Sequence, residues 1–292
     1  MSRHVGRWPL VGAALLLAAA AAAAAPDLPR HHPVPGGVAL VPLGEAPARP
    51  AARYAGRDVL VVRGPRGWTA VVGIPLTARP GLARLEVRDA RGARTVRFEI
   101  RAHDYPVQRI TLRDPKMVTP PASALARIRA ETARLRRGLA HRSPGAPERL
   151  RFAPPADGPL SSRFGLRRIL NGKPRSPHRG LDIAAPRGAP VRAPLAGTVL
   201  DVGDFYFTGR TVLLDHGGGL VTLYCHLDRV DVRRGERLAA GAPIGTVGAS
   251  GRATGPHLHW AVALNGALVE PTLFLEERPT SGGLRPAARS RN

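Results

Sequence analysis

Two short motifs in the second half of the chain contain side chains that bind transition metals. One is His178-Arg179-Gly180-Leu181-Asp182 and the other is His257-Leu258-His259. Two imidazoles and one carboxylate form a site with three protein ligands and one open position, which is the arrangement of a catalytic zinc ion. A structural zinc site usually closes with four ligands, often cysteines, and Cys225 is the only cysteine in the chain. The motifs therefore predict a catalytic metal site.

Both motifs are expected in extended segments. His178 and Asp182 would share one face of a helix, but the neighbouring prolines and Gly180 disfavour a helix here. Side chains of a strand alternate between its two faces, so residues 178, 180 and 182 are expected to share one face. By the same rule, His257 and His259 point away from the apolar residues that alternate with them, which are Leu258, Trp260, Val262 and Leu264.

Segment 221–227 follows the same alternation. Tyr224 and His226 are expected on one face of a strand, and the opposite face is expected to carry Val221, Leu223, Cys225 and Leu227. This places His226 where it can join His257 and His259. It also predicts that Cys225 is a small buried apolar residue, not a nucleophile.

Taken in order, these motifs resemble those of the lysostaphin/LytM-type zinc metalloendopeptidases, which hydrolyse the peptide cross-links of peptidoglycan. The resemblance covers residues 158–275 and includes three further segments, Ser162–Gly165, Tyr224–Leu227 and Thr254–Trp260. The region before residue 110 resembles, more weakly, the β domain that precedes the peptidase domain in bacterial members of the family.

The resemblance implies a role for each residue. His178, Asp182 and His259 would bind one zinc ion, His257 would be the general base, and His226 would assist it or stabilise the transition state. Zinc lowers the pKa of a bound water to about 7, which supplies hydroxide at neutral pH. The implied substrates are the stem peptides of peptidoglycan. A D-alanyl-diaminopimelate cross-link is the expected target, and a glycine bridge is the alternative.

Three other functions share part of this pattern. Some relatives have lost their ligands and only activate other wall hydrolases, whereas all five residues are present here. A non-haem iron oxygenase also uses two histidines and one carboxylate, but its reduced iron and cosubstrates are cytosolic. A carboxypeptidase that removes terminal D-alanine would use the same zinc chemistry and differ only in its product.

Residues 1–25 have the pattern of a signal peptide. Arg3, His4 and Arg7 precede an apolar run from Leu10 to Ala25, with a small-residue cleavage site near Ala25-Pro26. The run is shorter than the roughly 20 residues of a membrane span. We therefore expect export to the periplasm or cell wall, with no stable membrane span after signal removal. A retained anchor is the alternative.

The chain of 292 residues has a formal net charge of +23. Such a charge favours attraction to anionic envelope polymers, although a general preference for arginine codons accounts for its origin. Aromatic residues make up only 4% of the chain and do not alternate with the basic residues. No nucleic-acid-binding motif is present, so we expect no nucleic-acid partner.

The elements that must position these residues are mainly β. Residues 26–110 contain short apolar runs between glycine and proline turns, which predict an immunoglobulin-like β-sandwich. Residues 111–150 are expected to be a linker with a short helix over 122–140, where apolar residues recur at spacings of three and four.

Residues 151–275 are expected to form the zinc metallopeptidase domain. Glycines separate short strands here, and no alternating helices are visible, so the sheet should be antiparallel. Strands are expected over 197–200, 211–214, 220–227 and 257–264. Residues 276–292 are expected to be a disordered tail.

Overall fold

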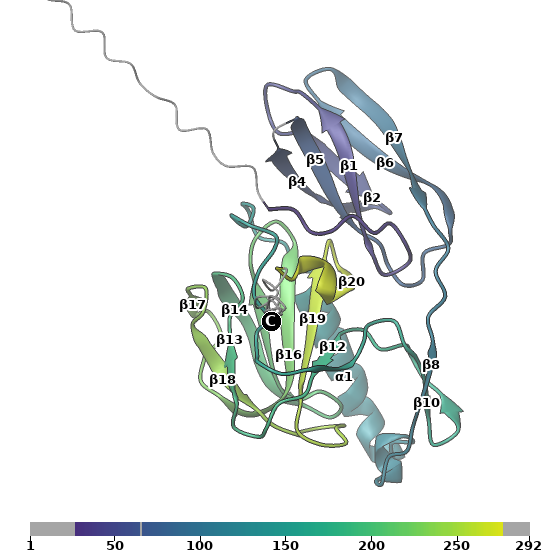
Figure 1. Cartoon of the computed structure of the whole chain (residues 1–292), viewed down its shortest axis with the longest axis vertical. Coiled ribbons are helices and arrows are strands. Elements are labelled where there is room, and N and C mark those ends of the chain that lie inside the picture. Colours follow the sequence, from purple (N-terminus) through teal and green to yellow (C-terminus); the bar gives the residue numbers. More distant parts are fainter. Residues whose placement is uncertain (1–26, 65, 277–292) are drawn as a thin grey trace, which may run out of the picture.

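The computed structural model describes residues 27–276, apart from residue 65. The expected signal peptide and all of the expected tail except Glu276 lie outside these residues. The described chain is mainly β, as predicted, with a β-sandwich, one α-helix and a large antiparallel sheet (Figure 1). None of the helices in the described part has the length and apolarity needed to cross a membrane.

The N-terminal part is a sandwich of two antiparallel sheets. One sheet has the order β1 (Val38–Gly44), β5 (Gly67–Gly73), β4 (Leu60–Gly64). The other has the order β3 (Arg57–Asp58), β2 (Ala51–Tyr54), β6 (Gly81–Asp89), β7 (Gly92–Ile100). Their facing sides share one apolar core that includes Val41, Val61, Val72, Leu85 and Val87.

The outer face of the three-stranded sheet packs against the C-terminal part. Val38, Leu60, Val62 and Val71 belong to the same apolar core as Trp260. Gly73 at the end of β5 lies so close to the C-terminal sheet that a Cβ there would be 2.6 Å from the carbonyl oxygen of Leu264. The side chain of Asn265 pairs with the backbone of Gly73, accepting from its N–H at 2.7 Å and donating to its carbonyl at 3.1 Å. The two parts are therefore joined by packing and by hydrogen bonds.

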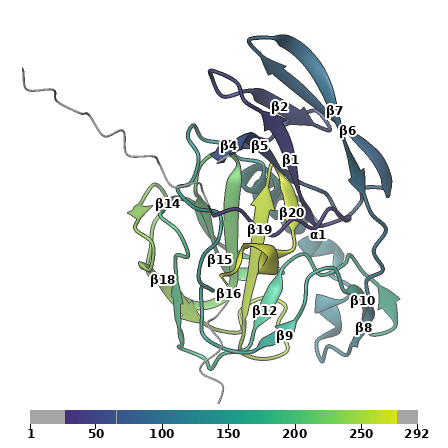
Figure 2. The same ribbon diagram turned by 45° about the horizontal axis from the view of Figure 1, so that its top comes forward.

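The linker crosses the molecule beside the C-terminal sheet. It contains β8 (Val107–Ile110), the 3-10 turn η1 (Pro115–Met117) and α1 (Ala122–Leu139), which confirms the predicted helix. β8 pairs in parallel with β10 (Arg167–Leu170), which also pairs with β11 (Lys173–Pro174). Helix α1 lies beside the C-terminal sheet (Figure 2), and its Leu135 and Leu139 pack against a small core around Cys225.

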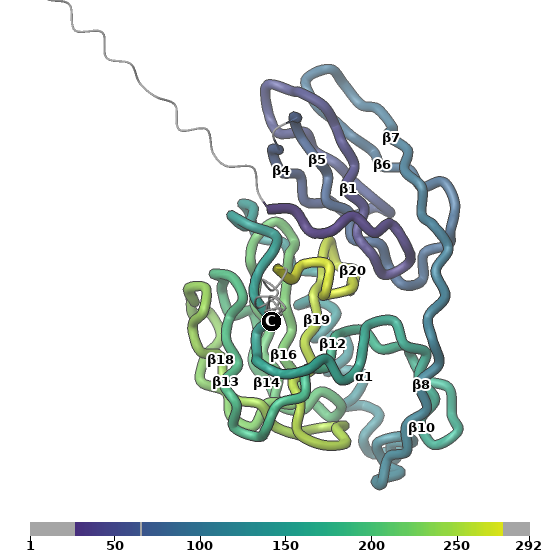
Figure 3. The backbone as a smooth tube through the Cα atoms, in the orientation of Figure 1, coloured from purple at the N-terminus to yellow at the C-terminus, as the bar shows by residue number. Residues whose placement is uncertain are grey.

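The C-terminal sheet has ten strands, and neighbouring strands run antiparallel. Figure 3 shows the course of the backbone through this part of the chain. Its main path has the order β17 (Arg237–Leu238), β14 (Gly197–Phe205), β15 (Gly209–Asp215), β16 (Leu220–Val230), β19 (Leu258–Leu264), β12 (Leu181–Ile183), β9 (Leu160–Ser162). The other members are β13 (Pro190–Arg192), β18 (Pro243–Val247) and β20 (Ala267–Val269), and the 3-10 turn η2 (Pro271–Phe274) follows.

The alternation predicted along segment 221–227 is wrong at His226. This residue has a φ of 62°, and the left-handed backbone shifts the side chains that follow it to the other face. Leu227 therefore joins Tyr224 in the main core, whereas Cys225 lies in the small core and pairs in register with His259. The prediction that Cys225 is a buried apolar residue is confirmed, and burial raises the pKa of its thiol to about 12.

Candidate metal centre

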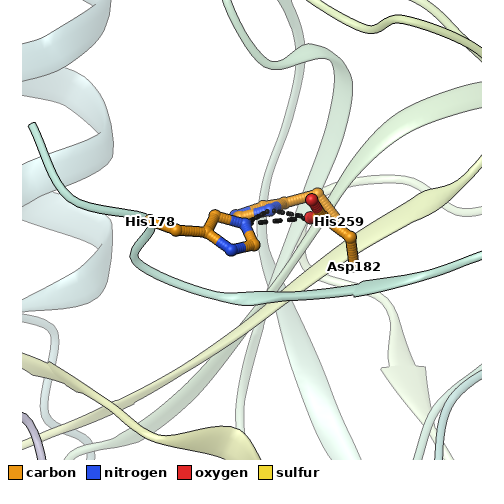
Figure 4. Close-up of side chains that lie close together, drawn as sticks. All are labelled: His178, Asp182 and His259. Atoms are coloured by element: carbon orange, nitrogen blue, oxygen red, sulfur yellow. Dashed lines mark hydrogen bonds and ion pairs between the residues drawn. The ribbon is translucent and has the colours of Figure 1, made fainter. Parts of the chain in front are cut away.

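Three of the predicted residues converge at two neighbouring strands of the C-terminal sheet, β12 and β19. Asp182 on β12 pairs in register with His259 on β19, and His178 lies on the loop that leads into β12. Asp182 Oδ1 is 2.9 Å from His178 Nε2 and 2.7 Å from His259 Nδ1. The two nitrogens are 3.0 Å apart, so each residue places one potential ligand atom in the same small region (Figure 4).

The donor atoms fit a metal ion. In a tetrahedral zinc site with bonds of about 2.0–2.1 Å, ligand atoms lie about 3.3 Å apart. The three atoms here would need to separate by only a few tenths of an ångström. Asp182 and His259 also line a cleft of about 360 Å³. A metal held by these residues would therefore keep one side open to the cleft, as a catalytic ion requires.

His178 is oriented by the chain just before it. Its Nδ1 is 2.7 Å from the carbonyl oxygen of Arg163 and 3.2 Å from Ser162 Oγ. A carbonyl can only accept, so Nδ1 donates its hydrogen and Nε2 keeps its lone pair for a metal. This contact explains why the segment 162–165 accompanies the motif in the sequence.

Gly180 makes room for His259. A Cβ at position 180 would lie 2.6 Å from both Cε1 and Nε2 of the His259 ring. Real carbon contacts are about 3.5–4.0 Å, so only glycine allows the ring to lie against this segment. The segment between His178 and Asp182 therefore needs a glycine at position 180 for the His259 ring to lie beside both residues.

Electrostatics favour the metal-binding forms of these groups. Burial alone would raise the pKa of Asp182, but its contacts with His178 and His259 hold that pKa far below its usual range. Arg168 adds an ion pair, with Nη2 at 3.2 Å from Asp182 Oδ2. Burial lowers the pKa of His259, against the opposing effect of Asp182. At neutral pH the site therefore contains a carboxylate and a neutral imidazole, which are the forms that bind metals.

His257 and His226 lie beside this group. His257 precedes β19, and its Nε2 is 4.0 Å from Asp182 Oδ1. The rings of His257 and His226 are 4.8 Å apart between centroids. His257 Nδ1 is 2.8 Å from the carbonyl oxygen of Gly255, and His226 Nδ1 is 2.7 Å from that of Ser250. Both Nδ1 atoms therefore donate, and in the neutral rings both Nε2 atoms are acceptors.

The environment keeps His226 neutral. Burial, together with the neighbouring His259 and His257, lowers its pKa to about 3, against the opposing effect of its hydrogen bond with Ser250. A neutral ring with Nδ1–H accepts at Nε2. His226 therefore suits the role of assisting the base, whereas donation to an oxyanion would need the cationic form that burial opposes.

The structure adds residues to the site that the motifs did not indicate. The linker contributes Gln108, Ile110 and Leu112 to the wall of the cleft, since β8 lies beside β10. Arg168, Arg252 and Ala253 form other parts of it, next to residues 254–256, which the resemblance already included. No local pattern marks these residues, because their position depends on the pairing of segments that are far apart in the sequence.

Comparison with known proteins gives matches to both parts of the chain. The model of peptidase family M23 matches residues 176–271, and the model of the peptidase family M23 N-terminal domain matches residues 31–103. The crystal structure of an M23-family protein from Pseudomonas aeruginosa is 44% identical, with a TM-score of 0.70, and the match covers 83% of this chain and 94% of that one.

Curated proteins also match part of the chain. The peptidoglycan DD-endopeptidase ShyC of Vibrio cholerae is 40% identical over 114 residues, which is 38% of this chain and 26% of that protein. The DD-carboxypeptidase/endopeptidase Mpg of Neisseria meningitidis is 40% identical over 112 residues, with the same shares of 38% and 26%. The chain thus matches about a quarter of the length of these relatives.

Proposed function

The chain belongs to peptidase family M23, as its motifs predicted, and on this premise we propose that it is a zinc-dependent endopeptidase that hydrolyses peptide cross-links of peptidoglycan in the periplasm or cell wall. The observation that carries the proposal is the convergence of His178, Asp182 and His259 on one point beside a cleft. The names of two relatives, the peptidoglycan DD-endopeptidase ShyC and the DD-carboxypeptidase/endopeptidase Mpg, support the substrate class.

In this proposal His178, Asp182 and His259 hold one zinc ion. The bound ion would polarise the scissile carbonyl and acidify a water molecule. His257 would take a proton from the attacking water at Nε2, which its hydrogen bond with Gly255 leaves free to accept. The same nitrogen then returns the proton to the leaving amine.

His226 and Arg168 support this chemistry. A water molecule has two hydrogens, and the second acceptor beside His257 is Nε2 of neutral His226. His226 therefore assists by orienting the attacking water. Arg168 holds Asp182 ionised through its contact with Oδ2, which leaves Oδ1 for the ion.

The test compares two alanine variants of the purified full chain. We expect His259→Ala to abolish both zinc binding and hydrolysis of isolated cell walls. His257→Ala should retain zinc and lose about 10²- to 10⁴-fold in turnover, the usual contribution of a general base. The exposed His141 lies outside the cleft, and His141→Ala should match the wild type in both measurements.

Products and metal dependence separate the alternatives. Zinc analysis and wall hydrolysis in the presence of a chelator should show that activity depends on the metal. A non-catalytic activator would release nothing from walls by itself. Mass spectrometry of digested muropeptides should show separated cross-links, whereas a carboxypeptidase would release only D-alanine. Full activity of the His259 variant would refute the ligand assignment.

A further inference from the structure

The wall of the cleft carries arginine side chains in excess of the acids around them. Arg168 and Arg252 line the cleft together with Asp182, His226 and His257. Arg175 lies close enough to Arg252 to repel its charge. Asp182 is the acid in this group, and it is already paired with Arg168 and placed among the metal-binding histidines.

Arg252 has only neutral partners among the described residues. Its Nη1 donates to the carbonyl oxygen of Met117 at 3.3 Å, and its guanidinium lies over the ring of Phe207 at 4.3 Å from the centroid. No carboxylate of the described chain lies within ion-pair distance of it. Stacking covers a face of the guanidinium, so Nε and Nη2 keep N–H groups in the plane for another ligand.

The uncompensated charge is unfavourable in the free protein. Burial, together with repulsion from Arg168 and Arg175, lowers the pKa of Arg252 to about 10. Arg175 donates to the carbonyl oxygens of Val118 at 2.8 Å and Pro174 at 3.0 Å, and these neutral partners leave its own positive charge uncompensated. A bound divalent metal would add further positive charge to the same cleft. An anionic group on a ligand would relieve this repulsion.

We propose that Arg252, with Arg168 beside it, is a subsite for a free carboxylate of the peptide that occupies the cleft. The proposal rests on the peptidase function proposed above and narrows its substrate class. A guanidinium binds a carboxylate through two parallel hydrogen bonds, which fixes the orientation of the peptide as well as its affinity. The preferred substrate is then a cross-linked peptide with a carboxylate next to the scissile bond, and a neutral glycine bridge is disfavoured.

The test uses a matched pair of substrates. Two synthetic cross-linked peptides differ only in whether the group next to the scissile bond is a carboxylate or a carboxamide. We expect the zinc-loaded wild type to cleave the carboxylate peptide with a kcat/KM about 10- to 100-fold higher, because a hydrogen bond to a charged group has about this effect. Arg252→Met should lower kcat/KM for the carboxylate peptide by the same factor and change that for the carboxamide peptide less than about twofold.

Two further variants control for charge and folding. Arg252→Lys retains the charge without the two-pronged geometry and should recover part of the preference. Arg234 is exposed and lies outside the cleft, so Arg234→Met should behave as the wild type with both peptides. Circular dichroism and zinc content should be unchanged in all three variants.

The outcomes separate the subsite from the peptidase function. Equal cleavage of the two peptides by the wild type would overturn the subsite and leave the function intact. A similar loss on both peptides in Arg252→Met would also overturn it, since it would show that Arg252 only holds the linker through Met117. Binding of both peptides to the metal-free full chain is measured by calorimetry as well. Tighter binding of the carboxylate peptide would support the subsite even without hydrolysis, and equal binding would overturn it.

Discussion

Substitution of Gly180 by alanine tests the architecture of the metal centre without removing any proposed ligand. The new Cβ would lie 2.6 Å from Cε1 and Nε2 of His259 and 2.7 Å from the carbonyl oxygen of Trp260. Ordinary contacts are about 3.5–4.0 Å, so the ring must retreat by about 1 Å. Because the third contact is a backbone atom, rotation of the His259 ring alone cannot relieve the overlap.

The expected magnitude follows from the tolerance of metal coordination. Metal–ligand distances are tolerated within about 0.2 Å, which is well below the required shift. His259 should therefore be displaced from its best position as a ligand without being removed. Disturbing the groups that orient a ligand usually lowers metal affinity about 10- to 100-fold, and we expect Gly180→Ala at the upper end of this range. The overpacking should also lower the free energy of unfolding of the metal-free protein by about 1–3 kcal/mol.

The assay is competition for zinc against a chelator of known affinity, followed by cell-wall hydrolysis at saturating zinc. A matched control is Gly64→Ala, because a Cβ at position 64 would meet its nearest neighbour at 3.6 Å, which is an ordinary contact. This variant should bind zinc as the wild type does. Wild-type zinc affinity in a correctly folded Gly180→Ala protein would refute the proposed position of His259 at the metal.

Two further predictions concern stability. Burial holds the pKa of His226 near 3, below its ordinary 6.5, so the folded protein favours the neutral ring. The contribution of this ring to the free energy of unfolding is complete above pH 6.5 and is lost as the pH falls toward 3. When the pH is lowered from 7 to 4, the free energy of unfolding of the metal-free wild type, measured in urea, should fall by about 3 kcal/mol more than that of His226→Gln. An equal decrease in the two proteins would contradict this prediction. Asn265→Gly removes both hydrogen bonds to Gly73, and the new glycine still tolerates the φ of 46° at this position. Its free energy of unfolding should fall by about 1–3 kcal/mol, and an unchanged value would show that this contact does not stabilise the docking of the sandwich.

Local patterns in the sequence were sufficient to predict the mainly β fold and the helix, whereas the set of His178, Asp182 and His259 came from the family resemblance, and the structure brings these three residues together. Strand alternation places functional and apolar residues on opposite faces, and this rule was correct for β19. The structure also places His226 and His257 next to the same group. Their chemical roles remain predictions that the variants above address.

The rule was wrong for segment 221–227 because of one backbone angle. Non-glycine residues rarely adopt a positive φ, and although histidine does so more often than most, its residue type alone does not predict the left-handed conformation of His226. The cleft wall was missed for a different reason. The pairing of β8 with β10 joins residues such as Gln108 and Arg168 that are about 60 positions apart. The local sequence of one strand does not indicate which distant strand it pairs with.

The left-handed residue in β16 also explains how one strand serves two purposes. Cys225 pairs with His259 and fills the small core, whereas Tyr224 and Leu227 both fill the main core. Regular alternation would allow only one of these two to lie in the main core. The bulge at His226 resolves this conflict and leaves the His226 ring beside His257. The irregular backbone at His226 therefore lets β16 do two things that a regular strand at this position could not. It places both Tyr224 and Leu227 in the main core, and it directs the His226 ring toward His257.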